Sequence, residues 1–253
     1  MTTATEVDHI SWSQIKSYTM CPLKHFLSRR YPPDFVPSAL KFGAAIHRAL
    51  AAYYEALVEG CNLTADEMLA VFHDAWAGEE LPIRFAFRET QDGLFGMAER
   101  MLNVFVEQVK PGNVIAVEQA FHIEISPDVP LVSGYIDLLE ERDGTLWIVD
   151  HKTSKSKPNG DLDAEQLHLY RIAAEELGFV DDDQLVACRF DALLKQKTKS
   201  DFVMVEVDTS DEDLDRVRRK AEQVWRGIEA EVVYPVRGWA CSGCQWASRC
   251  EEW

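Results

Sequence analysis

The first third of the chain carries apolar residues at helical spacing. In the segment ALKFGAAIHRALAAYYEALVEG, Phe42 and Ile46 begin a series that recurs every three or four residues, the period that places side chains on one face of a helix. The same spacing predicts two further helices, near 64–77 and 89–109. Residues 1–110 are therefore predicted to be mainly helical.

Beyond residue 110 the pattern changes to that of strands. Three runs rich in β-branched and aromatic residues, VIAVEQAFHIEI, VSGYIDLLEE and LWIVDHK, predict three strands, and RDGT predicts a hairpin turn between the last two. A helix near 162–177, strands near 184–193 and 202–208, and a helix from Ser210 to about residue 230 complete the pattern. This order predicts one α/β domain over residues 1–253, with a core sheet in 111–209 and a C-terminal helix and cysteine cluster in 210–253.

Composition and charge narrow the class of protein. A chain of 253 residues with 47% apolar content can bury a full core. It contains no run of about 18 uncharged apolar residues, and its first residues lack the pattern of a secretory signal, so we expect a cytoplasmic protein without a membrane span. The net charge of −17 argues weakly against nucleic-acid binding. Basic runs at 152–157, 195–199 and 216–220 are ordinary solvated faces or parts of a local basic groove.

The turn at Asp143–Gly144 predicts the position of two carboxylates. If these two residues form the whole loop, Arg142 pairs with Thr145. Continued along the strands, the register places Asp137 directly opposite Asp150, with Cβ atoms roughly 4.5–5.5 Å apart. Like charges in that position destabilise a sheet, whereas a divalent cation between them removes the repulsion, and carboxylate oxygens suit Mg²⁺ or Mn²⁺.

Lys152 lies on the same predicted face, and the three side chains fit phosphodiester hydrolysis. A bound metal lowers the pKa of its water and polarises the phosphoryl oxygen, while Lys152 would orient the attacking water or offset developing negative charge. The competing interpretation is that Asp137 and Asp150 are unrelated surface acids, since D-x-K is short and common. The apolar run 146–149 before Asp150 argues against it, because an unpaired carboxylate at an interior strand is costly.

Three cysteines, Cys241, Cys244 and Cys250, lie in the C-terminal sequence WACSGCQWASRCEEW. Cys21 precedes a proline that ends the first predicted helix, and it is the proposed fourth ligand. In a cytoplasmic protein a C-x2-C motif favours a metal site over a disulfide. The spacing alone leaves open zinc, with His25 as a replacement for Cys21, and an iron–sulfur cluster.

The chain also resembles a known family. SGYIDLLEERDGTLWIVDHKTSK looks like the core of the PD-(D/E)XK nuclease superfamily, with Asp137 in GYID and Asp150 and Lys152 in DHK. FGAAIHRAL is similar to the helix that supplies a metal-binding histidine in the RecB-type branch, and QLHLY matches that branch's Gln-x-x-x-Tyr signature. The four cysteines resemble the 4Fe–4S arrangement of AddB-type nucleases and of CRISPR-associated RecB-like exonucleases.

This resemblance implies a restriction-endonuclease-like α/β core, in which helices flank a mixed central sheet, with a helical N-terminal part and a C-terminal iron–sulfur segment. It implies the following roles: His47, Asp137 and Asp150 as ligands of Mg²⁺ or Mn²⁺; Asp137, Asp150, Lys152, Gln166 and Tyr170 as catalytic residues; and Cys21, Cys241, Cys244 and Cys250 as ligands of a 4Fe–4S cluster.

Several of these residues also have ordinary structural interpretations. His47 lies on a helix with an apolar face, where a lone histidine is usually a hydrogen-bonded core residue. Gln166 and Tyr170, four residues apart, share one helix face and could simply pack there. Glu118 is an additional metal ligand, a group behind the ligands, or a surface acid. We expect Trp239, Trp246 and Trp253 to shield the cysteine site, and residues 79–88 match no motif.

The combined expectation is a metal-dependent DNA exonuclease, acting on single strands or DNA ends and carrying a 4Fe–4S cluster. The alternative is a non-catalytic DNA-end-binding or adaptor subunit of a repair or CRISPR spacer-acquisition complex. DNA is the expected partner in both cases, with further protein partners in such a complex.

Overall fold

The computed structural model describes residues 9–158, 164–181, 183–196 and 200–253. In chain order the elements are β1 (His9–Ser11), α1 (Trp12–Met20), α2 (Pro22–Ser28), β2 (Val36–Pro37), α3 (Ser38–Val58), α4 (Ala65–Ala77), β3 (Ile83–Arg84), α5 (Gln91–Gln108), β4 (Asn113–Ile123), β5 (Leu131–Arg142), β6 (Thr145–Ser154), α7 (Glu165–Glu176), β7 (Leu185–Leu194), β8 (Asp201–Val207), α8 (Asp211–Glu229), the 3-10 helix η1 (Trp239–Gly243) and α9 (Ala247–Glu251). Among the described residues, no helix is both long enough and apolar enough to cross a bilayer.

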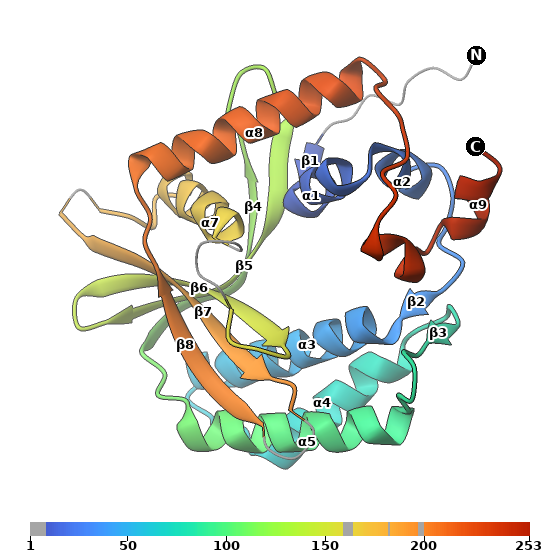
Figure 1. Ribbon diagram of the computed structural model, residues 1–253. Helices are drawn as coiled ribbons and strands as arrows, with labels where there is room; N and C mark the ends of the chain where they lie inside the picture. The colour runs from blue at the N-terminus through green and yellow to red at the C-terminus, as the bar shows by residue number, and fades with distance from the viewer. Residues whose placement is uncertain (1–8, 159–163, 182, 197–199) are drawn as a thin grey trace.

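A mixed sheet forms the centre of the molecule. Within the described ranges its strands follow the order β1-β5-β6-β7-β8, and β4 pairs with the other edge of β5. The β6–β7 pair is parallel, whereas β4–β5, β5–β6 and β7–β8 are antiparallel. Helices α7 and α8 lie on one side of this sheet and α3, α4 and α5 on the other (Figure 1). The expected α/β architecture, a mixed sheet flanked by helices, is confirmed.

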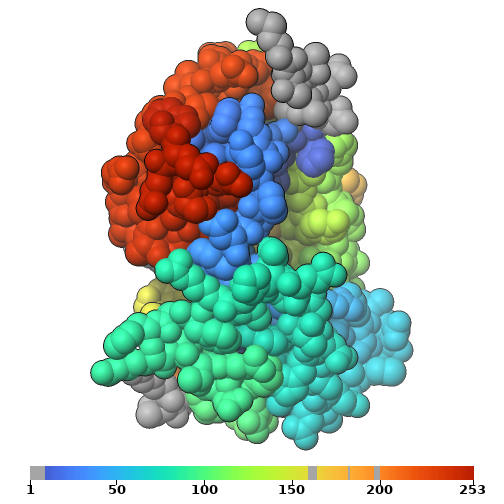
Figure 2. All heavy atoms as spheres, turned by 90° about the vertical axis from the view of Figure 1, so that its right-hand side faces the viewer, coloured from blue at the N-terminus to red at the C-terminus, as the bar shows by residue number. Residues whose placement is uncertain are grey.

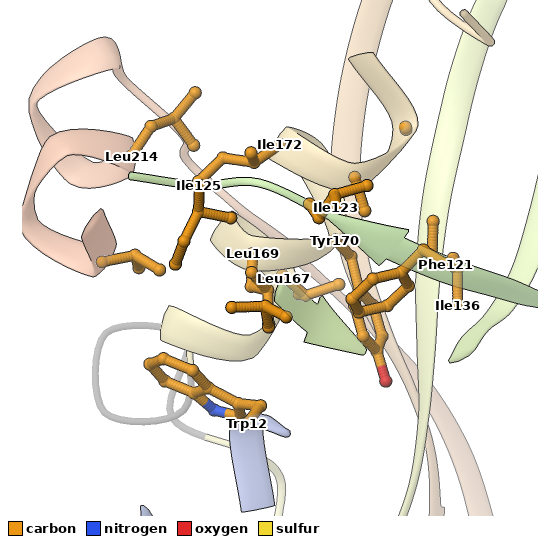
Figure 3. Packing of buried hydrophobic residues seen from close by; sticks show 14 of the residues in the cluster. Trp12, Phe121, Ile123, Ile125, Ile136, Leu167, Leu169, Tyr170, Ile172 and Leu214 are labelled. Atoms are coloured by element: carbon orange, nitrogen blue, oxygen red, sulfur yellow. The ribbon is translucent and has the colours of Figure 1, made fainter. Parts of the chain in front are cut away.

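Two apolar cores separate the sheet from these helices. The first core lies toward α1, α7 and α8, where Leu167 packs beside Trp12 and Leu169 (Figure 3). The second lies toward α3, α4 and α5 and includes Phe42 and Phe105. Both faces of the sheet are covered, which explains why its strands read as nearly continuous apolar runs.

The β5–β6 hairpin has the predicted register. Asp143 and Gly144 both have positive φ, 53° and 77°, as a two-residue primed turn requires. Arg142 pairs with Thr145, and the pairing continues to Leu138 and Val149. The ladder ends there, one position before Asp137 and Asp150.

Strand β5 divides one of its edges between two partners. Residues 131–133 pair with β1, and residues 138–142 pair with β6. The interval 134–137 therefore lies where β1 has ended and β6 has separated from β5. Within this interval the alternation of faces also breaks, because Ile136 and Leu139 contribute to the first core whereas Leu138 contributes to the second.

A buried ionic network lies on the second-core side of the sheet. Arg189 donates to Asp191 through Nε at 2.7 Å and to Glu140 through a terminal nitrogen at 2.8 Å. All three side chains are buried, and the second oxygen of Glu140 accepts the Gly112 N–H at 2.7 Å. The network links β5 to β7 across β6, and each buried charge has a partner, as burial requires.

Gly134 provides the close approach that the first core needs. A Cβ at this position would lie 2.6 Å from Cζ of Phe121, and the Phe121 ring packs edge-on against Tyr170 at 6.0 Å between ring centres. We expect Gly134→Ala to lower the free energy of unfolding by about 1–3 kcal/mol, because the ring must move in a filled core. Urea unfolding measures the change.

Gly78→Ala is the matched control, because its Cβ would meet no atom closer than 3.9 Å, and a change within about 0.5 kcal/mol is expected. Adding Phe121→Leu to Gly134→Ala should recover part of the loss. Equal stability of Gly134→Ala and the wild-type protein would contradict this account of the packing.

Candidate active site

The separation of β5 from β6 creates the centre of the site. Asp137 and Asp150 are 7% and 1% exposed, each one position beyond the end of the β5–β6 ladder. The backbone N–H of His151 donates to Asp137 Oδ2 at 2.8 Å, so a side chain replaces the next rung of the ladder. Burial and the neighbouring Asp150 charge raise the pKa of Asp137 well above its usual value, while the His151 N–H acts in the opposite direction.

His47 and Glu118 complete a three-residue donor group with Asp137. One donor atom from each lies within 4.8 Å of the others, and His47 Nδ1 is 3.5 Å from Asp137 Oδ2. Helix α3 supplies His47 and strand β4 supplies Glu118. One imidazole and two carboxylates, with Asp150 nearby, form a donor set that suits Mg²⁺ or Mn²⁺.

The backbone of Glu118 is unusual for a strand. Its φ is 46°, a value that non-glycine residues adopt infrequently and at a cost of about 1–3 kcal/mol. The flanking pairs Val117–Leu138 and Gln119–Ile136 leave Glu118 and Asp137 at the intervening positions of the two strands. The local distortion turns the Glu118 carboxylate toward His47 and Asp137.

The environment keeps His47 in the form that binds metals. Burial, followed by the positive charge of Lys152, lowers the pKa of His47 to about 4. The imidazole is therefore neutral at pH 7, and a ring nitrogen lone pair is available to a cation. Burial raises the pKa of Glu118, and the positive charge of Arg48 offsets part of this increase.

Lys152 begins a hydrogen-bonded chain that ends in the first core. Its Nζ is 2.6 Å from Asp150 Oδ2 and donates to Gln166 Oε1 at 3.0 Å. Gln166 Nε2 donates to the Tyr170 hydroxyl at 2.7 Å. The two α7 residues therefore connect the catalytic candidates to the first core. Burial and the charges of Asp137 and Asp150 raise the pKa of Tyr170, so its hydroxyl remains protonated.

Sequence reasoning missed His151, the middle residue of the D-x-K motif. Its ring is buried and stacks on Tyr54 at 5.6 Å between centres and 15° between planes. The same ring lies edge-on to His47 at 6.1 Å. Burial lowers the pKa of His151 well below its usual value, so the ring is an uncharged support behind the donor group. Strand alternation could have suggested its position, because side chains alternate along a strand and His151 therefore points to the opposite face of the sheet from Asp150 and Lys152.

A pocket of about 640 Å³ adjoins the donor group along the outer face of α3. The small residues Ala39, Gly43 and Ala44 form its lining, and His47 and Glu118 lie on its wall. A Cβ on Gly43 would be 3.6 Å from Thr153 Oγ1, which places this part of α3 close to the end of β6. The donor group is therefore accessible from this side.

The four cysteines lie at the contact between the two ends of the chain. Cys21 accepts the Val236 N–H at 3.4 Å, and Cys241 Sγ lies 3.8 Å from the carbonyl oxygen of the same residue. Cys244 and Cys250 pack against the small cluster formed by Leu23, Leu27 and Trp246. Burial and the nearby thiols of Cys21, Cys244 and Cys241 raise the pKa of Cys250. Figure 2 shows the C-terminal segment lying against the N-terminal helices.

The sulfur atoms do not converge as a single-ion site would require. Among the described residues, no three cysteine thiols lie within 4.8 Å of one another. The expected tryptophan shield is also incomplete. Trp246 is buried, but Trp239 and Trp253 are 86% and 61% exposed, and neither belongs to the apolar cluster that contains Trp246.

Comparisons with known proteins identify the family of the chain. Residues 9–251 match the PD-(D/E)XK nuclease superfamily. Gene 69 protein of Mycobacterium phage D29 is 32% identical over 192 residues, which cover 64% of this chain and 67% of the phage protein. The fold is similar to that of a candidate exonuclease from Eubacterium rectale, with a TM-score of 0.52 and 14% identity over 97% of this chain and 88% of that one. The chain belongs to the PD-(D/E)XK nuclease superfamily.

Proposed function

We propose that this chain is a divalent-metal-dependent DNA exonuclease that acts on single strands or DNA ends. The observation that carries the proposal is the buried Asp137–Asp150 pair, with His47 and Glu118 beside Asp137 and Lys152 bound to Asp150. A buried carboxylate whose pKa is raised, as that of Asp137 is, is unfavourable as a purely structural feature. It suits a site that gains a cation.

The donor atoms assign the proposed metal ligands. His47, Glu118 and Asp137 would hold a Mg²⁺ or Mn²⁺ ion together with Asp150. When bound, the cation supplies polarisation of the phosphoryl oxygen and a water of lowered pKa. Glu118 is therefore proposed as a metal ligand rather than as a group behind the ligands.

Lys152 is the proposed water-orienting and charge-stabilising residue. Its ammonium is fixed by Asp150 and Gln166, so it requires little reorganisation as negative charge develops on the phosphoryl oxygens. The attacking water adds hydroxide to phosphorus, the phosphorus–oxygen bond to the leaving nucleotide breaks, and the departing oxygen takes up a proton. Gln166 and Tyr170 are proposed as positioning residues, because Gln166 accepts from Lys152 and is held in turn by Tyr170.

We also propose that Cys21, Cys241, Cys244 and Cys250 bind a 4Fe–4S cluster. Their gathering from both chain ends supports a shared site. A single zinc ion with bonds of about 2.3 Å would hold all four sulfurs within about 4 Å of one another, closer than these thiols lie, and the resemblance of the cysteine spacing to that of AddB-type nucleases favours the cluster. Such a group would fasten the C-terminal segment to α2 and stabilise the fold.

The first test concerns cleavage. Asp150→Asn and Lys152→Gln should each reduce Mg²⁺- or Mn²⁺-dependent degradation of end-labelled single-stranded DNA by a factor of about 10² or more, with unchanged circular dichroism. Lys110→Gln, at an exposed lysine between α5 and β4, is the control and should degrade DNA at the wild-type rate. Wild-type activity in the Lys152 variant would contradict the proposal. A wild-type protein that binds DNA ends without cleaving them would indicate the non-catalytic adaptor instead.

A second test concerns pH and stability. The pKa of Asp137 is higher in the folded protein than its usual value of 3.8. At pH values between 3.8 and the raised pKa, the folded state therefore binds more protons than the unfolded state. The stability of the metal-free protein therefore falls as pH rises through that window. Asp137→Asn should remove this loss, so its metal-free Tm should exceed the wild-type Tm by an amount that grows with pH.

The same variant should lose the rise in Tm that Mn²⁺ gives the wild-type protein. Asp143→Asn, in the exposed hairpin turn, is the control, and its Tm should follow the wild-type values with and without Mn²⁺. A Tm of Asp137→Asn that lies below the wild-type Tm at every pH would show that the carboxylate is structurally required.

A third test concerns the cysteines. Cys250→Ser should lower the iron and acid-labile sulfide content of anaerobically purified protein and reduce its Tm, because a cross-link between the chain ends is lost. Cys61→Ser, at an exposed position after α3, should leave both unchanged. A colourless wild-type protein with one equivalent of zinc would overturn the iron–sulfur assignment.

A further inference from the structure

The segment around residues 83–89, which matches no motif, forms a braced loop. The pairing of β2 with β3 places Ile83 beside Val36 and holds the loop against the start of α3. Glu89 then accepts the Ala86 N–H at 3.2 Å and the hydroxyl of Ser38, the first residue of α3. The loop is therefore fixed to the helix that carries His47.

This loop presents an aromatic ring and a cation to solvent. Phe87 is 89% exposed, and the Arg88 guanidinium carbon lies 5.0 Å from the centre of its ring. Arg88 has a φ of 60°, which costs a non-glycine residue about 1–3 kcal/mol. A single exposed phenylalanine requires no explanation, but an exposed ring held under a strained arginine does.

Three more pairs of an arginine and an aromatic ring lie in neighbouring segments. Arg30 lies over Phe26 at 3.4 Å, Arg84 over Phe35 at 4.7 Å, and Arg249 over Tyr31 at 5.0 Å. We call these four pairs, Phe26–Arg30, Tyr31–Arg249, Phe35–Arg84 and Phe87–Arg88, the Arg–aromatic surface. Their segments, from the N-terminal helices, the β3 region and the C-terminal end, share one face of the molecule (Figure 2).

The charge of this surface contrasts with that of the whole chain. The chain has 43 acidic and 26 basic residues, so a surface arginine has many carboxylates available. Yet among the described residues no carboxylate lies within 4.0 Å of Arg30, Arg84 or Arg88 in an ion pair, whereas arginines of α8 such as Arg216 are paired with acids. Arg249, the fourth arginine of the surface, is paired with Glu252 at 3.2 Å. The other three have aromatic partners and, within the described ranges, no ion-paired carboxylate, and such cations are complementary to a ligand that has anionic groups and flat rings.

We propose that the Arg–aromatic surface binds single-stranded DNA ahead of the active site, with Phe87 stacking on a base and Arg88 contacting a phosphate. Unpaired bases offer π faces to aromatic side chains, and arginine adds phosphate and cation–π contacts. Duplex DNA offers no free base faces, because its bases are stacked on one another. The proposal rests on the proposed nuclease function and names its substrate class.

The separation between this surface and the donor group suits a bound strand. Ser38, which Glu89 contacts, precedes His47 by nine residues on α3, or about 14 Å at 1.5 Å per residue. That span corresponds to on the order of four nucleotides at about 3.4 Å each. A strand end in the active site would therefore still be attached to bases at the Phe87 loop.

Two variants test the proposal with little effect on folding. Phe87→Ser removes the ring and keeps the charge, and Arg88→Gly removes the guanidinium while glycine readily adopts the positive φ. In EDTA, where no metal supports cleavage, fluorescence anisotropy gives the Kd for a labelled oligo-dT. Each variant should bind about tenfold more weakly than the wild-type protein. Leu185→Ser, a 70% exposed apolar residue on β7, and Arg218→Gln on α8 are the controls and should leave the Kd unchanged.

An abasic strand separates base stacking from phosphate contact. The wild-type protein and Arg88→Gly should bind it more weakly than oligo-dT, whereas Phe87→Ser should not distinguish the two strands. Wild-type Kd values in both variants would overturn the proposal, as would a change in oligomeric state by light scattering with an unchanged Kd for DNA. The Kd is measured in EDTA without cleavage, whereas the Asp150→Asn and Lys152→Gln variants test cleavage, so failure of the nuclease function and failure of the binding surface are distinguished.

Discussion

Burying two carboxylates side by side is unfavourable, and this cost is the constraint around which the site is organised. Asp137 and Asp150 lie at the point where β5 and β6 separate, both buried from water. The His151 N–H and the Lys152 ammonium offset part of their negative charge. The cation proposed above would offset more of it, and metal binding and local stability would then be two aspects of one electrostatic balance.

The rest of the fold holds this unfavourable arrangement in place. On one face of the sheet, Gly134 allows Phe121 to pack closely, and Phe121 contacts Tyr170. The Tyr170 hydroxyl accepts a hydrogen bond from Gln166, which in turn accepts one from Lys152. On the other face, the rings of Tyr54 and His151 fill the space behind His47 and Asp137. Tightly packed aromatic groups resist the relaxation that would otherwise let the carboxylates move apart.

Local rules in the sequence predict much of this, and non-local contacts account for what they miss. The Asp143–Gly144 turn determines the β5–β6 register because a two-residue loop permits a single pairing. Periodicity likewise predicts the long helices and the main strands. The positive φ of Glu118 depends on the separation of two other strands, so the local pattern gives no sign that its carboxylate turns toward His47. The exposure of Trp239 could not be predicted either, because an aromatic side chain suggests burial and the local sequence does not show that this one lies on the surface.

An acidic protein that binds an acidic polymer must separate its charges in space. Helix α8 begins with Asp211, Glu212 and Asp213, and its Arg216 is already paired with two of these acids. Arg30, Arg84 and Arg88 of the Arg–aromatic surface have rings as partners, whereas Arg249 is also paired with Glu252. If this surface binds DNA as proposed, the acidic regions would repel a strand and these arginines would attract it, which would favour approach from the side where unpaired bases can stack. Charge distribution would then serve specificity, whereas the net charge of −17 alone argues against DNA binding.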